Sequence, residues 1–273
     1  SNFGYDVGVT VSRYVNEVID IDGSSETFFP GGFDSRIGIV NFNQVGEPIS
    51  SFYGWTADGY FQSQAEVDAH ADQNGAAPGR IRFQDLNNDG VINDDDKGAI
   101  GNPHPDFTLG FNLGVDVGQF DFSVFLYASV GNEVFNYEKL FNVFSFFNAN
   151  VRKDVVTDSW TPSNPNAKYP INDLNDIFSI SPNTFYVEDA SYLRAKNVQV
   201  GYTFPQTTVG TVFSNLRIYL QAQNLFTITD YSGLDPSPSN FGQSGLNGDL
   251  WNGFDLGNYP TERRFMFGVN ATF

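Results

Sequence analysis

Residues 107–130 read FTLGFNLGVDVGQFDFSVFLYASV, and apolar side chains occupy every second position along most of this stretch. Successive side chains of a β-strand point to opposite faces, so the alternation predicts strands with one apolar face and one face of polar or small residues. Gly118-Gln119 interrupts the pattern and predicts a short turn between two antiparallel strands. Each strand of this hairpin has about ten residues, which is the length needed to cross a bilayer at a tilt.

The same alternation recurs in four further segments, at residues 3–12, 197–204, 216–223 and 264–273. Two weaker strands are predicted, at Ile37–Val45 and Ile49–Phe61, which gives eight candidate strands in all. Short or moderate connections alternate with long ones, and the long ones are residues 15–36, 62–106, 131–187 and 227–262. Short turns at one end and long loops at the other are typical of an antiparallel transmembrane β-barrel. A soluble β-sandwich or jelly roll is the alternative, but it would not need loops of this length.

Composition excludes several classes of protein. The chain has 28 Phe and 13 Tyr but one Met, which favours strands over helices. It carries 14 Lys+Arg against 32 Asp+Glu, a net charge of −18. This charge argues against nucleic acid as a partner, because phosphates are bound by clustered Lys and Arg. No stretch approaches the roughly 20 apolar residues of a membrane-spanning helix.

Several strings of residues resemble, in their order along the chain, the C-terminal third of the SusC/RagA-type TonB-dependent transporters. The strings are residues 48–55 (PISSFYGW), 58–61 (DGYF), 85–96, 100–107 (IGNPHPDF), 160–166, 191–198 (SYLRAKNV), 201–202, 223–227 (QNLFT), 231–236 (YSGLDP) and 259–273. Each string alone is weak, and the ordered set is specific because it covers nearly the whole chain.

The resemblance implies a 22-stranded barrel in the bacterial outer membrane, closed by an N-terminal plug and in contact with lipid. Such a barrel imports oligosaccharides or peptides with energy supplied through TonB, and a SusD-like surface lipoprotein covers it as a lid. Residues 1–273 are then expected to be the C-terminal portion of one barrel domain of about eight strands. The expected extracellular loops are residues 62–106, 131–187 and 227–262. The plug, the TonB-contacting segment and the earlier strands are expected in another part of the same protein.

The two ends of the chain carry further expectations. The chain opens at Ser1 within a strand-like pattern and without a signal peptide, which indicates a fragment or a processed chain. Phe273, Ala271 and Gly268 resemble the terminal signal read by the barrel-assembly machinery, although Met266 stands where that signal usually has a polar residue.

Residues 85–96 read DLNNDGVINDDD and have the spacing of a calcium-binding loop. Such a loop takes oxygen ligands at positions 1, 3, 5, 7 and 12, with a Gly at position 6 for the sharp turn. The predicted Ca²⁺ ligands are the side chains of Asp85, Asn87, Asp89 and Asp96 and the carbonyl of Val91. The ion would hold the loop rigid. The alternative is an acidic turn satisfied by its own Asx hydrogen bonds.

The sequence predicts no enzyme and no catalytic residue. It has no Cys, and its two His, His70 and His104, are far apart and show no zinc-binding spacing. The aromatic residues of 135–147 are interpreted as the core of a loop, with a helix under the lid protein or a sugar-stacking surface as alternatives. Three Trp stay undecided among sugar platform, membrane-interface girdle and loop packing: Trp55, Trp160 and Trp251. Arg263 and Arg264 are expected to pair with luminal carboxylates, and no substrate-binding residue is identified.

Three functions remain open. The first is a wall of an energised importer. The second is a passive porin-like or small barrel. The third is a soluble, calcium-stabilised carbohydrate-binding β module.

Overall fold

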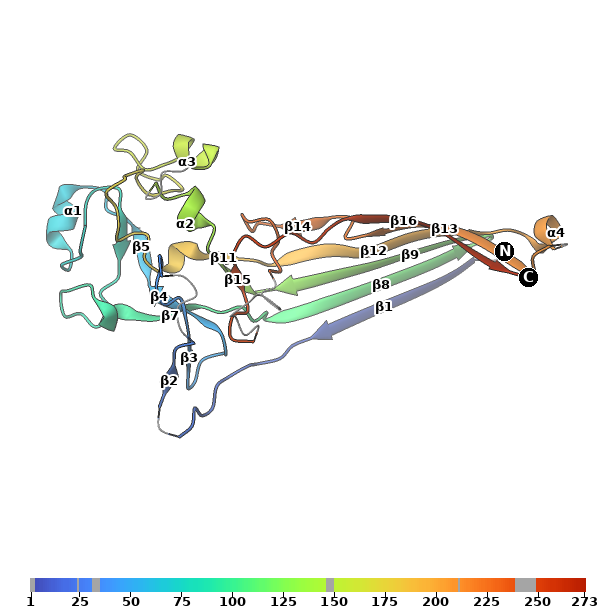
Figure 1. Cartoon of the computed structure of the whole chain (residues 1–273), viewed down its shortest axis with the longest axis horizontal. Helices are drawn as coiled ribbons and strands as arrows, with labels where there is room; N and C mark the ends of the chain where they lie inside the picture. The colour runs from blue at the N-terminus through green and yellow to red at the C-terminus, as the bar shows by residue number, and fades with distance from the viewer. Residues whose placement is uncertain (1–2, 24, 31–34, 146–149, 211, 239–248) are drawn as a thin grey trace.

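The computed structural model describes residues 3–23, 25–30, 35–145, 150–210, 212–238 and 249–273. It consists of a long antiparallel sheet and, at one end of that sheet, a head built from short strands and helices (Figure 1). The sheet contains six long strands in the order β1-β8-β9-β12-β13-β16, and the short strand β14 pairs with β12. Their bounds are β1 Phe3–Ser12, β8 Phe107–Val117, β9 Phe120–Val130, β12 Tyr192–Thr203, β13 Asn215–Gln223, β14 Thr227–Thr229 and β16 Arg264–Thr272.

The register of the long sheet keeps apolar side chains beside apolar side chains. Val7 pairs with Leu113, Leu113 with Val124, and Val124 with Val198. A slip of one residue in any pair would move that strand's apolar side chains to the opposite face. The alternation read from the sequence is therefore realised as two distinct faces.

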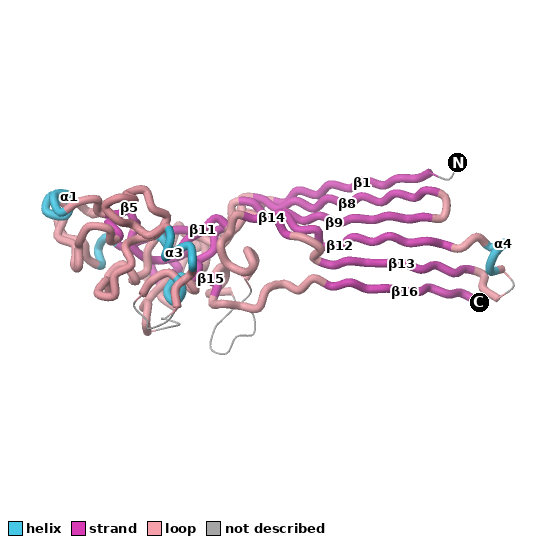
Figure 2. The backbone as a smooth tube through the Cα atoms, turned by 90° about the horizontal axis from the view of Figure 1, so that it is seen from above, coloured by secondary structure: helices cyan, strands magenta, loops and turns pink. Residues whose placement is uncertain are grey.

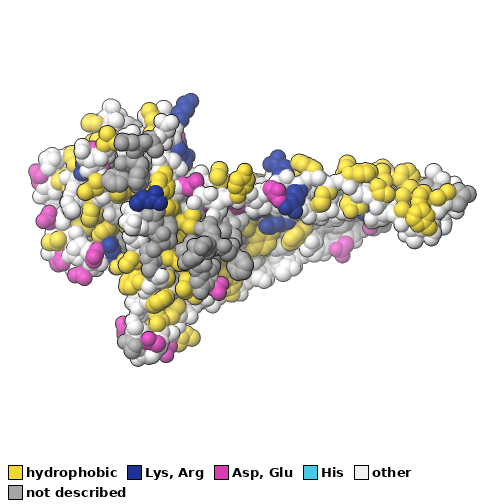
Figure 3. All heavy atoms as spheres, in the orientation of Figure 1, with side chains coloured by type: hydrophobic (Ala, Val, Ile, Leu, Met, Phe, Trp, Pro, Cys, Tyr) yellow, Lys and Arg dark blue, Asp and Glu magenta, His cyan; other side chains and the backbone are white. Residues whose placement is uncertain are grey.

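The apolar face of the long sheet is not covered by protein in the part of the chain that the structure describes. Tyr5 is 73% exposed, Leu220 63% and Phe265 70%. Neither of the buried apolar clusters contains a residue of the six long strands. Figure 3 shows apolar side chains along the part of the sheet that is distant from the head. A continuous apolar surface of this kind is stable against hydrocarbon and not against water.

The opposite face carries polar side chains that bond across strands. Arg217 on β13 reaches over β12 to Asp121 on β9, with an Nη2–Oδ2 distance of 2.5 Å. It crosses above Gly201, where a Cβ atom would clash with both side chains. In the same way the ring of Tyr219 lies over Gly268 of β16. Glycine at these two positions lets the long side chains lie along the sheet.

The two ends of the sheet differ as the sequence predicts. The connections at one end are the turn at Gly118-Gln119 and residues 204–214, which include α4 (Gln206–Val209). All long connections run into the head at the other end (Figure 2). The fold class, an antiparallel all-β sheet of barrel type, is confirmed.

The head contains three small sheets joined by short helices. Their orders are β2-β3-β4-β7, β5-β6 and β11-β10-β15. The strands are β2 Thr27–Phe28, β3 Asn41–Gln44, β4 Ser51–Trp55, β5 Ala57–Tyr60, β6 Ile81–Phe83, β7 Lys97–Gly101, β10 Glu133–Asn136, β11 Val187–Asp189 and β15 Phe254–Asp255. The helices are α1 Gln64–Ala69, α2 Lys139–Asn142 and α3 Lys153–Thr157, with the 3₁₀ turns η1 Asp94–Asp96 and η2 Thr184–Tyr186.

The two weaker predicted strands are corrected by this arrangement. Residues 37–45 and 49–61 form the short strands β3, β4 and β5 of the head, so six strands and not eight build the long sheet. The burial of neighbouring side chains explains the difference. Phe42, Ser51 and Phe52 are all buried, so both faces of these short strands are covered, and buried residues do not alternate with exposed ones.

Stacked aromatic rings fill the core of the head. Phe135 stacks on Tyr186 at a centroid distance of 5.1 Å, and Phe254 meets Phe52 edge-on at 5.0 Å. Residues 135–144 thus form loop core, as interpreted from the sequence, while Phe146 and Phe147 lie outside the described residues. Burial also decides among the three roles left open for the Trp side chains. Each is at most 5% exposed, so all three take part in loop packing: Trp55, Trp160 and Trp251.

Among the described residues, no helix has the length and apolar character needed to span a membrane.

A charge placed on the apolar face tests its environment. Leu220 lies near the middle of β13, and Leu220→Arg should lower the free energy of unfolding in phospholipid vesicles by about 2–4 kcal/mol. Gln221 is the neighbouring residue on the polar face, where it bonds to Asn197. Gln221→Arg should cost about 1 kcal/mol, the value of one hydrogen bond. Urea denaturation measures both, and equal costs at the two positions would contradict the assignment of the faces.

Candidate functional site

A buried arginine joins the polar face of the long sheet to the head. Arg194 on β12 is 2% exposed, and its Nη2 donates to Asp235 Oδ1 at 2.7 Å. Its other nitrogens donate to the hydroxyls of Thr227, Ser237 and Thr261 at 2.8–3.2 Å. A buried guanidinium is stable only when its charge is paired and its donors are satisfied. These contacts therefore fix the segments around residues 227, 235 and 261 against the sheet.

A β-bulge at Lys196 places Arg194 on the polar face. The register of β12 against β9 shifts between Ala195 and Asn197, so one residue of β12 has no partner. Without the extra residue Arg194 would point to the apolar face. With it, Arg194 lies opposite Tyr127. The chain after β13 continues to pair with β12 past the bulge, since Leu225 donates its N–H to the carbonyl of Ala195 and Ala195 donates to the carbonyl of Phe226.

The partner of Arg194 is held in its charged form. Burial alone would raise the pKa of Asp235, but hydrogen bonds from Thr261, Arg194 and Ser237 lower the pKa well below the usual value. The stabilisation is complete above the unfolded-state pKa of about 3.9 and disappears only in strong acid, as the pH falls through the lowered value. The contact is thus constant over the physiological pH range.

Next to this contact lies a hollow of about 260 Å³, at the point where the polar face meets the head. Tyr127 of β9 and Tyr192 of β12 line it from the sheet, and Tyr14 lines it from the segment that follows β1. Asn132 and Glu133 border it from the start of the head. Burial raises the pKa of Glu133, whose carboxylate accepts the N–H of Asn102 at 2.9 Å.

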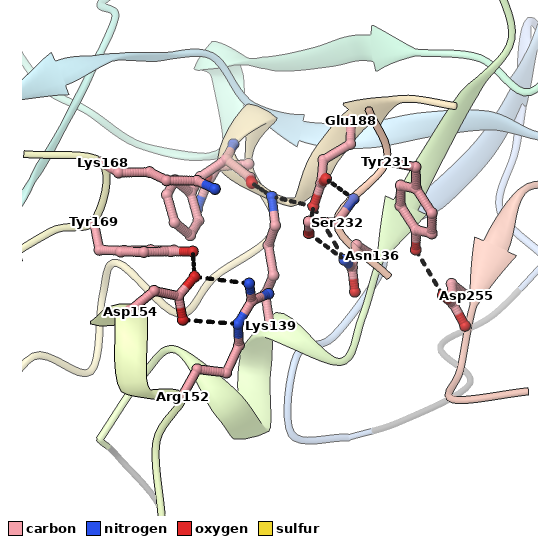
Figure 4. Close-up of polar contacts among 12 residues, drawn as sticks. Asn136, Lys139, Arg152, Asp154, Lys168, Tyr169, Glu188, Tyr231, Ser232 and Asp255 are labelled. Atoms are coloured by element: carbon pink, nitrogen blue, oxygen red, sulfur yellow. Dashed lines mark hydrogen bonds and ion pairs between the residues drawn. The ribbon is translucent and has the colours of Figure 1, made fainter. Parts of the chain in front are cut away.

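A second polar cluster lies inside the head (Figure 4). Lys139 of α2 pairs with Glu188 of β11 at 2.8 Å and donates to the carbonyl of Phe185 at 2.5 Å. Ser232 and Asn136 also donate to Glu188. Burial lowers the pKa of Lys139, opposed by the charge of Glu188. The cluster is buried, and its charges on Lys139 and Glu188 are paired, so it holds three loop segments together. Only the buried Oδ1 of Asn136 among its described groups has no hydrogen-bond partner.

The other contacts in Figure 4 are also structural. Tyr169 donates to Asp154 at 2.6 Å, and this bond with those from Arg152 lowers the pKa of Asp154 to about 2. Tyr231 donates to Asp255 at 2.6 Å. The first contact joins residue 169 to α3, and the second joins residue 231 to β15.

The acidic loop has the turn that the calcium prediction requires. Gly90 has φ +87, and Asp85 accepts the N–H groups of Asp89 and Gly90 at 3.2 and 2.9 Å. Asn87 and Asp89 lie beside it, joined by a 3.0 Å hydrogen bond. Asp96 instead is buried and accepts the N–H groups of Leu86 and Asn93, while Val91 is exposed.

The loop therefore brings three of its four predicted side-chain ligands together and directs the fourth, the carboxylate of Asp96, to the backbone. Within the described ranges, no group of three or more Asp, Glu, His or Cys side chains is placed to hold a metal ion. The hydrogen bonds found are those of the Asx alternative, and the calcium site stays a prediction.

Three further residues singled out in the sequence, His70, His104 and Arg264, bond to other parts of the chain, and the pairing expected for Arg263 stays a prediction. His70 bonds through Nε2 to the carbonyl of Phe83, and His104 bonds to the carbonyl of Ile49 and the hydroxyl of Tyr14. Arg264 pairs with its neighbour Glu262 at the start of β16 instead of with a carboxylate across the sheet. Sequence reasoning missed the Arg194–Asp235 contact, although both residues belong to strings that carry the resemblance.

Six long antiparallel strands with an uncovered apolar face, a polar face and long loops at one end define a segment of a membrane β-barrel wall. No model of a protein family matches the chain. Two TonB-dependent receptors of Formosa agariphila are 34% and 32% identical to it over 277 residues, across the whole of this chain and 27% of each relative. SusC of Bacteroides thetaiotaomicron, also a TonB-dependent receptor, is 26% identical over all of this chain and 25% of its own length.

The chain belongs to the SusC/RagA-type TonB-dependent receptors. It spans about a quarter of the length of the curated relatives it matches. A solved structure of the RagAB peptide transporter has the same fold, with a TM-score of 0.73 and 20% identity over 99% of this chain and 27% of that chain. These relatives are receptors and transporters, in agreement with the expectation that the chain is not an enzyme.

Neutralising Asp235 tests the buried contact. Asp235→Asn leaves the charge of Arg194 buried without a counter-charge, which should lower the free energy of local opening by about 3–5 kcal/mol. Hydrogen exchange of peptides that cover residues 192–195 and 225–237 measures this opening. The matched control is Asp58→Asn, because Asp58 forms an exposed 3.0 Å pair with Arg82. The control should cost at most about 1 kcal/mol, and an equal effect of the two changes would show that the Arg194 contact does not hold the head.

Proposed function

We propose that this chain forms part of the wall and the outer loops of an energised importer in the bacterial outer membrane. The observation that supports it is the uncovered apolar face of the six long strands, in a chain that matches TonB-dependent receptors over its whole length. The apolar face contacts lipid, the polar face lines the lumen, and the head is extracellular. The chain performs no chemistry on the solute.

The edges of the long sheet imply the rest of the barrel. Within the described residues, β1 pairs only with β8 and β16 only with β13. Unpaired backbone groups are very costly in hydrocarbon, so these edges require neighbouring strands. We assign those strands, the plug and the TonB-contacting segment to the remainder of the same protein. The total of 22 strands is the expectation from the family.

The head is the surface on which a SusD-like lipoprotein would sit. It projects beyond the sheet at the end that carries all long connections (Figure 1). The head has an aromatic core of its own and is fixed to the long sheet through Arg194, so it offers a rigid surface to a covering lipoprotein. The solute is an oligosaccharide or a peptide. The RagAB structure is that of a peptide transporter, and its likeness to this chain, at 20% identity, is one of fold.

The alternative functions differ in two observable properties. A soluble carbohydrate-binding module would have to cover the face that bears Tyr5, Leu220 and Phe265, which no described residue covers. A passive porin shares the exposed face but needs no energy source. Energy dependence is therefore the property that separates an importer from a porin.

Uptake by intact cells tests the importer. Cells that carry the complete gene should deplete a mixture of oligosaccharides or of peptides from the medium, and cells with the gene deleted should not. An ionophore that collapses the inner-membrane potential should reduce the rate at least tenfold. Uptake that continues unchanged would assign the protein to the passive porins. Recovery of the protein from the soluble fraction without detergent would favour the soluble module.

We also propose that residues 85–96 bind Ca²⁺ as a structural ion. The ligand spacing and the positive φ of Gly90 support this proposal. Binding requires Asp96 to exchange its backbone hydrogen bonds for the ion.

A calcium chelator should then accelerate hydrogen exchange in residues 85–96 of the intact protein at least several-fold. Asp85→Asn removes charge from the ion's ligands and keeps an oxygen for only one of the N–H groups of Asp89 and Gly90, which bond to different oxygens of Asp85. The variant should exchange at least as fast without chelator as the unmodified protein does with it, and chelator should not change its exchange. Exchange of the unmodified protein that is the same with and without chelator would leave the Asx hydrogen bonds as the complete explanation of the loop.

A further inference from the structure

The hollow at the junction of sheet and head lies on the luminal wall beside the outer mouth. Its sheet side is formed by Thr108, Tyr127 and Tyr192, which occupy polar-face positions at the head end of β8, β9 and β12. On the proposed function, a solute that passes from the head into the lumen travels along this stretch of wall. The hollow therefore lies where an imported molecule meets the barrel.

The aromatic side chains of the hollow are held in place before any solute arrives. Tyr14 donates its hydroxyl to Nδ1 of His104 at 3.1 Å, while Nε2 of His104 donates to the carbonyl of Ile49 at 2.9 Å. The guanidinium of Arg194 lies over the ring of Tyr192 at 4.9 Å and is itself fixed by Asp235. The rings of Tyr127 and Tyr192 are 6.0 Å apart. A rigid set of rings binds a partner with little loss of conformational entropy.

The polar groups of the hollow suit an uncharged partner. Four of its lining residues are proline, at positions 103, 105, 236 and 238, and these have no N–H to offer. The side chains that line the hollow offer mainly hydroxyl groups, amide groups and ring faces. Glu133 is the one charged residue among the lining residues, and its carboxylate accepts the N–H of Asn102. An anionic group in this hollow would find no cation among the lining residues, and a cationic group would find only this one carboxylate.

We propose that this hollow is a solute-binding subsite of the importer and that it takes a ring of a neutral oligosaccharide. A sugar ring has apolar C–H faces that pack on tyrosine rings and hydroxyls around its edge that bond to side-chain hydroxyls and amides. A peptide in extended form is instead held through main-chain hydrogen bonds, for which the prolines supply no donor. The inference rests on the proposed function and gives it a substrate class.

Binding to the complete, purified transporter tests the subsite. One probe is a mixture of neutral oligosaccharides from partial hydrolysates of starch, xylan and mannan, and the other is a protease digest of casein. Retained molecules are identified by mass spectrometry, and their dissociation constants are then measured. The expected result is retention of a neutral oligosaccharide, with binding about tenfold or more weaker in Tyr127→Ala and Tyr192→Ala. Tyr127→Phe keeps the ring and should lose less than Tyr127→Ala.

Tyr219→Ala is the matched control. Tyr219 is also a luminal tyrosine, but it lies over Gly268 and does not line the hollow. It should leave oligosaccharide binding unchanged, and circular dichroism should show the same β content in every variant. Equal losses in Tyr219→Ala and Tyr192→Ala, or no loss in Tyr192→Ala, would overturn the subsite.

Retention of peptides that depends on Tyr127 and Tyr192 would overturn the substrate class, and retention of neither probe would overturn the proposal. Uptake in cells separates this inference from the proposed function. Energy-dependent uptake that is unaffected by Tyr192→Ala would support the importer and contradict the subsite. Absence of energy-dependent uptake would contradict the proposed function itself.

Discussion

A strand that lies in hydrocarbon must satisfy its backbone hydrogen bonds with neighbouring strands, because no water is present to do so. The long sheet meets this requirement through continuous antiparallel ladders from β1 to β16. Once the strands are paired, their two-residue period assigns each side chain to lipid or to lumen. Phe and Val therefore alternate with Gly, Asn and Asp along the same strand, and composition averaged over the chain has no apolar excess. The mean hydropathy of −0.28 reflects this mixture.

The same constraint explains why the head has a core of its own. In an ordinary globular domain, loops would pack on the apolar face of the sheet. Here that face is committed to lipid, so the long connections bury Phe52, Phe135, Tyr186 and Phe254 against one another. They attach to the sheet through a polar contact, Arg194 with Asp235, because the side of the sheet available to them is polar. The protein thus has two apolar regions: one is buried inside the head, and the other faces lipid.

The sequence predicts local order well and long-range contacts poorly. The hairpin of residues 107–130, the strands near both termini and the two-ended arrangement of connections follow from period and turn residues, and the structure confirms them. Residues 37–45 and 49–61 were assigned to the barrel because short apolar runs do not reveal whether a strand is buried on one face or on both. The bulge at Lys196 was missed, since no residue type marks it, and with it the polar-face position of Arg194. The hollow combines residues from position 14 to position 253 and is visible only in three dimensions.

Two glycines of the polar face have a consequence for the width of the barrel lumen. At Gly201 and Gly268 the absence of a side chain creates shallow recesses, in which Arg217 and Tyr219 lie flat along the wall. Any larger residue at either position would displace these long side chains from the sheet and turn them toward the axis of the pore. The free width of the lumen beside these strands therefore depends on two residues that have no side chain of their own.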